Sequence, residues 1–110
     1  MSEPTMPLSG VRIIDFTQVM LGPCATQMLG DFGADVIKIE RPGSGDLSRN
    51  FFGVNTEEAM NNAVFASLNR NKRSVTIDTK SDEGRQQILD MVKSADVLVD
   101  NFRAGVMDRL

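Results

Sequence analysis

Histidine, tryptophan and tyrosine are absent from this chain of 110 residues, and cysteine occurs once. Without histidine, neither a Ser-His-Asp nor a Cys-His mechanism can be assembled from this chain alone. One cysteine and no histidine also exclude a structural zinc site and an internal disulfide framework. A single cysteine suits a reducing compartment, so we expect a cytoplasmic location.

The chain also has no excess of basic residues and no long hydrophobic run. Its net charge is −3, and without tryptophan or tyrosine it offers few aromatic platforms for bases, so we expect no nucleic-acid partner. No apolar run approaches the ~20 residues that span a bilayer, and the N-terminus lacks the features of a secretory signal, so we expect no membrane association. The remaining composition, 41% hydrophobic and 25% charged, is typical of one globular domain at most.

The stretch from Val11 to Asp46 predicts a strand, a helix and a second strand. An apolar strand at 11–16 is followed by Gly22-Pro23, which suits the first turn of a helix, and Gly33 suits its end. A second apolar strand begins at Val36. The spacing i, i+3, i+4, i+7 predicts a common apolar face of the helix, formed by Ala25, Met28, Leu29 and Phe32. Two strands joined by a helix form a right-handed βαβ unit.

The remainder of the chain continues the alternation of helices and strands. After a loop at 41–55, Thr56 is an expected N-cap of a helix, and Ser81 is the expected N-cap of the next. Strands are expected at 74–78 and 96–99, and a last helix at 104–110. The first of these helices is expected to have one weakly apolar face, formed by Met60, Ala63, Val64 and Ser67, and the second a buried stripe, formed by Ile88, Leu89, Val92 and Ala95. We therefore predict an α/β fold with a Rossmann-like, mostly parallel sheet and flanking helices.

The predicted sheet of four parallel strands has edges that no other predicted element covers. Natural domains usually cover the edges of a sheet, so we expect this sheet to be incomplete. We expect residues 1–7 to form a flexible lead-in and residues 8–110 to form the N-terminal part of a larger, truncated domain.

Basic residues gather near the predicted strand ends, where ligands bind in parallel sheets. Such a cluster in an acidic chain favours an anionic ligand, and phosphate groups such as those of coenzyme A (CoA) fit guanidinium side chains. The alternative is that these are solvated loop charges. The cluster comprises Arg41, Arg70, Lys72, Arg73, Lys80, Arg103 and Arg109.

Several other features leave alternatives open. The Rossmann layout, with Glu40 after the second strand, fits a dinucleotide site, but the first turn lacks G-x-G-x-x-G and Pro23 removes one N–H donor. Cys24 is either a nucleophile at a helix N-terminus or a small buried residue. The turn at 43–46 is either a phosphate nest or a simple reverse turn. Asp15, inside an apolar strand without an evident basic partner, is expected to shape the strand end.

The run LSGVRIIDFTQVMLGPCATQMLGDFGADVIKIERPGSGD resembles the N-terminus of the class III CoA-transferases. This family includes formyl-CoA transferase, carnitine CoA-transferases and α-methylacyl-CoA racemase. NRNKRSVTIDTK, EGRQQILDMVKSADVLV and DNFRAGVMDRL are also similar to family segments and occur in the same order. The resemblance covers nearly the whole chain from Leu8 onward.

The resemblance implies a CoA thioester and a small carboxylic acid as substrates, with no permanently bound cofactor. It implies an aspartate nucleophile that forms a mixed anhydride and then an enzyme-bound thioester, in a segment beyond Leu110, so no catalytic residue is assigned here. It also implies an interlocked homodimer for the full-length protein. Carried over position by position, the CoA contacts are Met20, Leu21, Arg41, Ile77, Asp78, Thr79, Lys80, Asn101, Phe102, Arg103 and Arg109.

One position departs from a branch of the family. Formyl-CoA transferases have an active-site glutamine where this chain has Met20, whose thioether cannot donate a hydrogen bond. This weighs against a formyl-CoA:oxalate assignment but not against membership. Three hypotheses follow: the CoA-binding portion of an acyl-CoA transferase or racemase, inactive by itself; a non-catalytic interaction module; or the nucleotide-binding half of an oxidoreductase.

Overall fold

The structure, a computed structural model, describes residues 5–53 and 62–110 and contains one parallel sheet. Its strand order is β3-β2-β1-β4, which confirms the predicted α/β class. The strands are β1 (Arg12–Asp15), β2 (Asp35–Glu40), β3 (Lys72–Thr76) and β4 (Val97–Val99). The helices are α1 (Leu21–Asp31), η1 (Leu47–Gly53, a 3-10 helix), α3 (Ala63–Leu68), α4 (Asp82–Val92) and α5 (Val106–Arg109). None of the helices in the described residues is long and apolar enough to cross a membrane.

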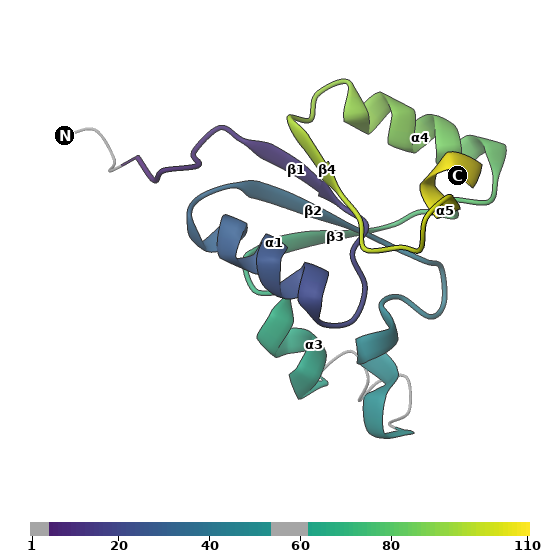
Figure 1. Cartoon of the computed structure of the whole chain (residues 1–110), viewed down its shortest axis with the longest axis horizontal. Helices are drawn as coiled ribbons and strands as arrows, with labels where there is room; N and C mark the ends of the chain where they lie inside the picture. The colour runs from purple at the N-terminus through teal and green to yellow at the C-terminus, as the bar shows by residue number, and fades with distance from the viewer. Residues whose placement is uncertain (1–4, 54–61) are drawn as a thin grey trace.

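Helices cover both faces of the sheet (Figure 1), and the two faces differ in the side chains that they present. One face packs against α4 and α5 through an apolar core built on Ile14, Phe16, Ile39 and Ile77. The other face lies under α1 and is apolar only near the strand starts, around Ile13 and Val36. Because side chains alternate along a strand, the residues after these on the α1 face form polar rows towards the strand ends.

The third strand begins earlier than predicted. Lys72 and Arg73 pair with Val36 and Ile37 of β2, so β3 starts at Lys72, not at Ser74. Ile77 and Asp78 follow the strand and belong to the turn that leads into α4. Lys72 and Arg73 are polar, so the sequence offered no sign that the strand includes them. Their backbone pairing with β2 makes them part of β3.

Helix α1 begins and ends close to its predicted bounds, but of its predicted apolar face only Leu29 packs against the core. Gly33 follows the helix with a φ of +102°, a conformation that favours glycine. Met28 and Phe32 are each 54% exposed, and Ala25 is exposed as well. The residues that face the sheet are instead Gly22, Pro23, Thr26, Gln27 and Gly30. The reason is that α1 covers the polar rows of the sheet, which need hydrogen-bonding and small partners.

Helix α4 has the predicted N-cap, since the Ser81 hydroxyl accepts a hydrogen bond from the backbone N–H of Gly84. Its predicted buried stripe is only partly right. Ile88 and Ala95 pack on the core, and Met91 joins them. Leu89 is 58% and Val92 38% exposed in this chain, because they lie beside an apolar groove next to β4 that no described residue fills.

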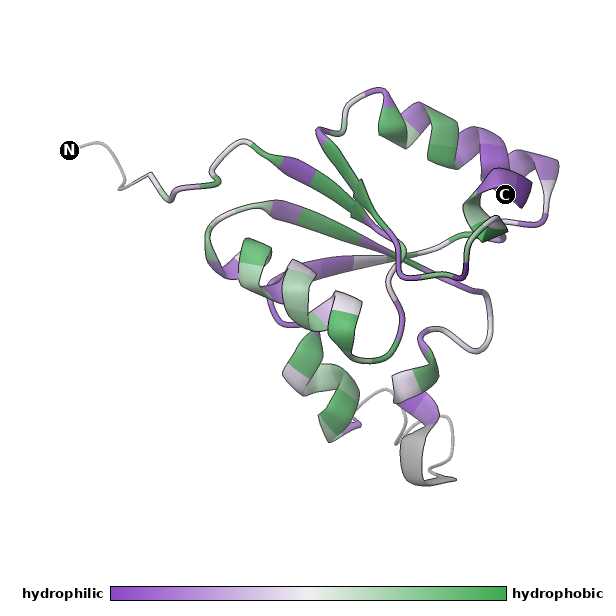
Figure 2. Ribbon diagram, in the orientation of Figure 1, coloured by the Kyte–Doolittle hydropathy of each residue, from purple (hydrophilic) through white to green (hydrophobic). Residues whose placement is uncertain are grey.

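Helix α3 is shorter than the helix expected after the loop. Asn62 is its N-cap and accepts a hydrogen bond from the backbone N–H of Val64. The predicted N-cap Thr56 and the predicted face residue Met60 lie outside the described residues. Figure 2 shows α3 as a largely hydrophobic helix next to α1.

Candidate functional site

Asp15, at the end of β1, lies in a fully buried polar cluster. Its carboxylate is 0% exposed and accepts hydrogen bonds from the backbone N–H and hydroxyl of Thr17 and from the hydroxyl of Thr26. The Lys72 ammonium lies 3.0 Å from the same carboxylate. Burial lowers the pKa of Lys72, and the charge of Asp15 opposes this shift. Asp15 therefore has the basic partner that the sequence did not reveal, from the start of β3.

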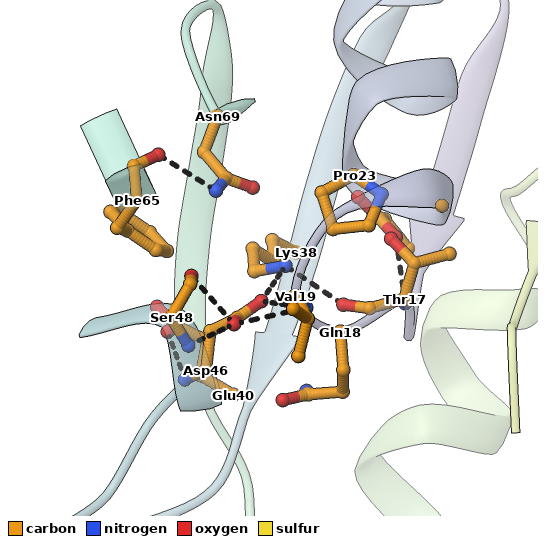
Figure 3. A network of polar contacts seen from close by, with 12 residues as sticks. Thr17, Gln18, Val19, Pro23, Lys38, Glu40, Asp46, Ser48, Phe65 and Asn69 are labelled. Atoms are coloured by element: carbon orange, nitrogen blue, oxygen red, sulfur yellow. Dashed lines mark hydrogen bonds and ion pairs between the residues drawn. The ribbon is translucent and has the colours of Figure 1, made fainter. Parts of the chain in front are cut away.

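A second buried ion pair joins Lys38 of β2 to Asp46 (Figure 3). The Lys38 Nζ atom lies 2.8 Å from the Asp46 carboxylate and donates to the backbone carbonyl of Thr17 at 2.8 Å. Burial alone would raise the pKa of Asp46, but the hydrogen bonds and charge of Lys38 and the N–H of Ser48 hold it below its usual range. The pair links the ends of β1 and β2.

Glu40, the last residue of β2, completes the buried acidic groups at this edge. Its carboxylate accepts two hydrogen bonds from Arg49 at 2.8 Å, one from the Ser74 hydroxyl and one from the backbone N–H of Asp46. Burial would raise the pKa of Glu40, but these donors, led by Arg49, hold it below its usual value. Glu40 is therefore a structural anchor and not a free ribose-binding carboxylate.

The turn at 43–46 is closed by its own hydrogen bonds. The N–H of Gly45 donates to the carbonyl of Arg41, and the N–H of Asp46 donates to Glu40. The N–H of Ser44 donates to the carbonyl of Pro42. Because three successive N–H groups are already used, the phosphate-nest interpretation is wrong and the reverse-turn alternative is right.

The turn after β1 leads from Thr17 to Met20 and is held on both sides. The Asn101 side chain bridges the backbone N–H and carbonyl of Gln18, and Asp46 accepts from the backbone N–H of Val19. Val19 has a φ of +71°, which a β-branched residue rarely adopts. Beyond it, Met20 is 58% and Leu21 83% exposed.

The cations of the chain fall into two groups. Eight of the twelve lysine and arginine side chains contact a carboxylate: Arg12, Lys38, Arg49, Arg70, Lys72, Arg73, Arg85 and Lys93. Within residues 5–53 and 62–110, the other four side chains have neither an ion pair nor a hydrogen bond. These four are Arg41, Lys80, Arg103 and Arg109.

The predicted basic cluster is therefore corrected at three positions. Arg70 pairs with Asp31, the last residue of α1, and Arg73 pairs with Asp35 at the start of β2, the opposite end of the strand from the carboxyl edge. Lys72 is buried against Asp15. Arg70 precedes β3, and Lys72 and Arg73 are its first two residues, so the strand ladder places the backbone of all three away from the strand's carboxyl end.

Arg41 lines three hollows at the carboxyl edge of the sheet. It shares an open hollow of about 230 Å³ with Asp78, Thr79 and Lys80. A hollow of about 330 Å³ lies between Arg41, Arg49 and the end of β3. A smaller one of about 40 Å³ adds apolar walls, formed by Phe16, Ile39, Ile77, Phe102 and Leu110.

The structure thus brings together about half of the site residues expected from the resemblance. Arg41 and Phe102 lie with the turn at 77–80 around the shared hollows. Asn101 is engaged with the main chain of Gln18. Like Asn101, four further expected residues line none of these hollows: Met20, Leu21, Arg103 and Arg109.

Sequence analysis missed Lys38 and Asp46 as organising residues of this edge. The signal for Lys38 was present, since Val36, Lys38 and Glu40 alternate with isoleucines along β2. Charged residues at alternate positions of an otherwise apolar strand, here Lys38 and Glu40, predict that one face of the strand is polar. Nothing in the sequence indicated which carboxylate would pair with it.

Neither a thiol centre nor a metal centre is evident at this edge. Cys24 is half-buried in the first turn of α1, and its N–H donates to the carbonyl of Met20. In the part of the chain that the structure describes, no group of three or more His, Cys, Asp or Glu side chains could hold a metal ion.

The chain forms a parallel α/β domain that, among the residues the structure describes, leaves Arg41 and Lys80 without carboxylate partners at the carboxyl edge of its sheet. The chain belongs to the CoA-transferase family III, whose model matches residues 8–110. It is 50% identical over 106 residues to the formyl-CoA:oxalate CoA-transferase of Rhodopseudomonas palustris strain BisB18, and 49% identical to that of Bradyrhizobium diazoefficiens. Each match covers 96% of this chain and 24% of the relative.

Two solved structures are similar to this chain in both fold and sequence. The Rv3272 protein of Mycobacterium tuberculosis superposes with a TM-score of 0.84 and 41% identity, over 97% of this chain and 28% of that one. A CAIB/BAIF family protein from Brucella suis gives a TM-score of 0.83 and 35% identity, over 96% and 28% of the two chains. The chain thus spans about a quarter of the length of the relatives it matches.

Proposed function

We propose that this chain is the N-terminal CoA-binding portion of an acyl-CoA transferase, which moves CoA between carboxylic acids. The observation that carries the proposal is the set of four cations without carboxylate partners in the described residues, of which Arg41 and Lys80 line one hollow. Folding has paired the other eight cations, so these four are the ones available to the phosphates of CoA. Family membership supplies the reaction class.

In this proposal the chain binds and orients CoA, and an aspartate outside residues 1–110 attacks the thioester. The anhydride and enzyme thioester of the family mechanism form on that aspartate. The two fully buried aspartates of this chain support this division of roles. Asp15 and Asp46 are each 0% exposed and held by lysines, so neither can reach a substrate. By itself, the chain should bind CoA and catalyse nothing.

The substrates of the whole protein are proposed, because the names of the relatives describe the substrates of those relatives only. The proposed substrates are a CoA thioester and a small carboxylic acid, in an interlocked homodimer of the full-length protein in the cytoplasm. The racemase alternative shares the same CoA site and differs in chemistry outside this chain.

A second candidate is a non-catalytic interaction module with the same half-fold. The exposed apolar residues favour it, since Phe32, which follows α1, and Leu89 of α4 are each more than half exposed. Such a module would fold or gain stability only with a partner chain and would show no affinity for CoA.

Titration calorimetry of the purified chain with CoA tests these alternatives, with NAD and dephospho-CoA as comparison ligands. A charge-assisted hydrogen bond contributes about 1.5–3 kcal/mol, so Arg41→Ala should weaken CoA binding about tenfold or more. Arg70→Ala is the matched control, because Arg70 is exposed but paired with Asp31. CoA binding that is insensitive to Arg41→Ala would contradict the proposed site.

The other outcomes separate the remaining hypotheses. No heat with CoA from a chain that is folded by circular dichroism would refute autonomous CoA binding and favour the interaction module. Tighter binding of NAD than of CoA would favour the oxidoreductase half. Weaker binding of dephospho-CoA than of CoA would support recognition of the 3′-phosphate by the unpaired cations.

A further inference from the structure

The turn from Thr17 to Met20 is held in a conformation that its own sequence does not favour. Val19 has a φ of +71°, although a β-branched side chain is crowded in this region. Strained residues persist where surrounding contacts over-determine them, and they concentrate at functional sites. The contacts that hold this turn therefore matter for what it presents, which is the exposed pair Met20 and Leu21.

The fully buried side chains among these contacts are those of Lys38 and Asp46. The two oxygens of Asp46 lie 3.1 and 3.3 Å from the backbone nitrogen of Val19. Lys38 donates to the carbonyl of Thr17 at 2.8 Å. The pair therefore holds the turn through the carbonyl of Thr17 and the N–H of Val19, one on each side of Gln18 (Figure 3). The side chains of Lys38 and Asp46 are 1% and 0% exposed. Neither charged group can reach a ligand.

Asp46 also ends the loop that carries Arg41. Its own N–H donates to Glu40, and its carboxylate accepts from both the N–H and the hydroxyl of Ser48. The side chain of one residue therefore joins the turn after β1 to the loop after β2. These are the two segments that, in the proposed function, contact CoA from neighbouring strands.

We propose that Lys38 and Asp46 are positioning residues, which fix the turn after β1 against the loop after β2 without touching the ligand. The proposal rests on the proposed function in so far as the ligand is CoA. Its geometric part, that the pair holds the strained turn, stands independently of which ligand binds.

The test compares amide hydrogen exchange in the chain and in three variants. In Asp46→Asn, one amide oxygen replaces two carboxylate oxygens, and the ammonium of Lys38 competes for it, so the N–H of Val19 loses its acceptor. In Lys38→Met/Asp46→Asn, that oxygen returns to Val19 and no unpaired buried charge remains. Asp90→Asn is the control, because it makes the same change in an exposed pair on α4.

We expect Asp46→Asn to lower the protection of the Val19 amide at least tenfold more than that of the Ile14 amide in β1. We expect the double variant to restore only part of the Val19 protection, because the carbonyl of Thr17 still lacks its Lys38 donor, and CoA affinity to follow the same order. Protection lost equally at Val19 and Ile14 would show a general loss of stability and overturn the proposal. Selective loss at Val19 with unchanged CoA affinity would also overturn it.

A wild-type chain that does not bind CoA would refute the proposed function and leave the exchange result to decide the positioning role. If Asp46→Asn does not fold, the double variant decides alone. A protected Val19 with CoA affinity within twofold of wild type would then support the role of the amide contact, and an unprotected Val19 with wild-type affinity would overturn it.

Discussion

Replacing Lys72 with methionine should destabilise this chain more than the loss of any exposed cation. The Lys72 ammonium donates to the carbonyl of Pro23 at 3.0 Å and to Asn69 at 2.9 Å, and it lies 3.0 Å from Asp15. Three acceptors need three donors, so the side chain is charged despite the burial that lowers its pKa. Methionine keeps the apolar length but removes every donor, which leaves the Asp15 carboxylate buried without a cation.

The expected loss is about 3–5 kcal/mol, the typical result of removing one partner of a buried ion pair. Small domains are stable by only about 5–15 kcal/mol, so this is a large part of the total. Arg73→Met is the matched control, one residue further along β3. Arg73 is 65% exposed, and Asp35 keeps Arg12 as a partner, so the expected loss is at most about 1 kcal/mol.

Urea unfolding followed by far-UV circular dichroism is the suitable assay, because the chain has no tryptophan or tyrosine for fluorescence. With a slope of about 1–3 kcal/mol per M, Lys72→Met should lower the midpoint by roughly 1 M or more. Adding Asp15→Asn should recover part of the loss, since no buried charge then remains unpaired. A cost for Lys72→Met no greater than that of Arg73→Met would refute the argument.

Two further predictions concern stability. Gly84→Ala should cost about 1–3 kcal/mol in the same urea assay, because a Cβ atom there would overlap the carbonyl oxygen of Asp78. The free energy of unfolding should fall as the pH drops below about 5, because the cationic partners of Glu40 and Asp46 hold both folded pKa values below their usual range. Their stabilisation is complete above the unfolded pKa values and is lost as the pH falls through the folded ones, which urea midpoints at pH 7 and pH 4 would measure.

The order of strands and helices was predictable because local signals agree with it. The apolar strands, Pro23 in the first turn of α1, Gly33 after its end and the cap at Ser81 all act within a few residues. The exposed face of α1 was not predictable in this way. Its apolar spacing is real, but the sheet face beneath it is polar, and that face is defined by strands distant in sequence.

The candidate site shows the same division. The basic residues that follow strands were identified from their positions, and Arg41 and Lys80 line one hollow. Arg70, Lys72 and Arg73 were wrongly grouped with them, because the predicted start of β3 was two residues too late and placed Lys72 and Arg73 in a loop. The buried pair of Lys38 and Asp46 joins residues eight positions apart around a turn, and only the fold brings their charges to 2.8 Å.

Two of the four cations that lack carboxylate partners in the described residues nevertheless have carboxylates close by in the sequence, which agrees with the proposed anion site. Lys80 is close in sequence to Asp78, and Arg103 is close to Asp100. In the structure, however, Asp78 accepts from the backbone N–H of Lys80, and Asp100 accepts from that of Phe102. These carboxylates shape the turns after β3 and β4, and the neighbouring cationic side chains keep their charge exposed. In an acidic chain, turns that orient carboxylates towards the backbone leave a positive edge where an anion can bind.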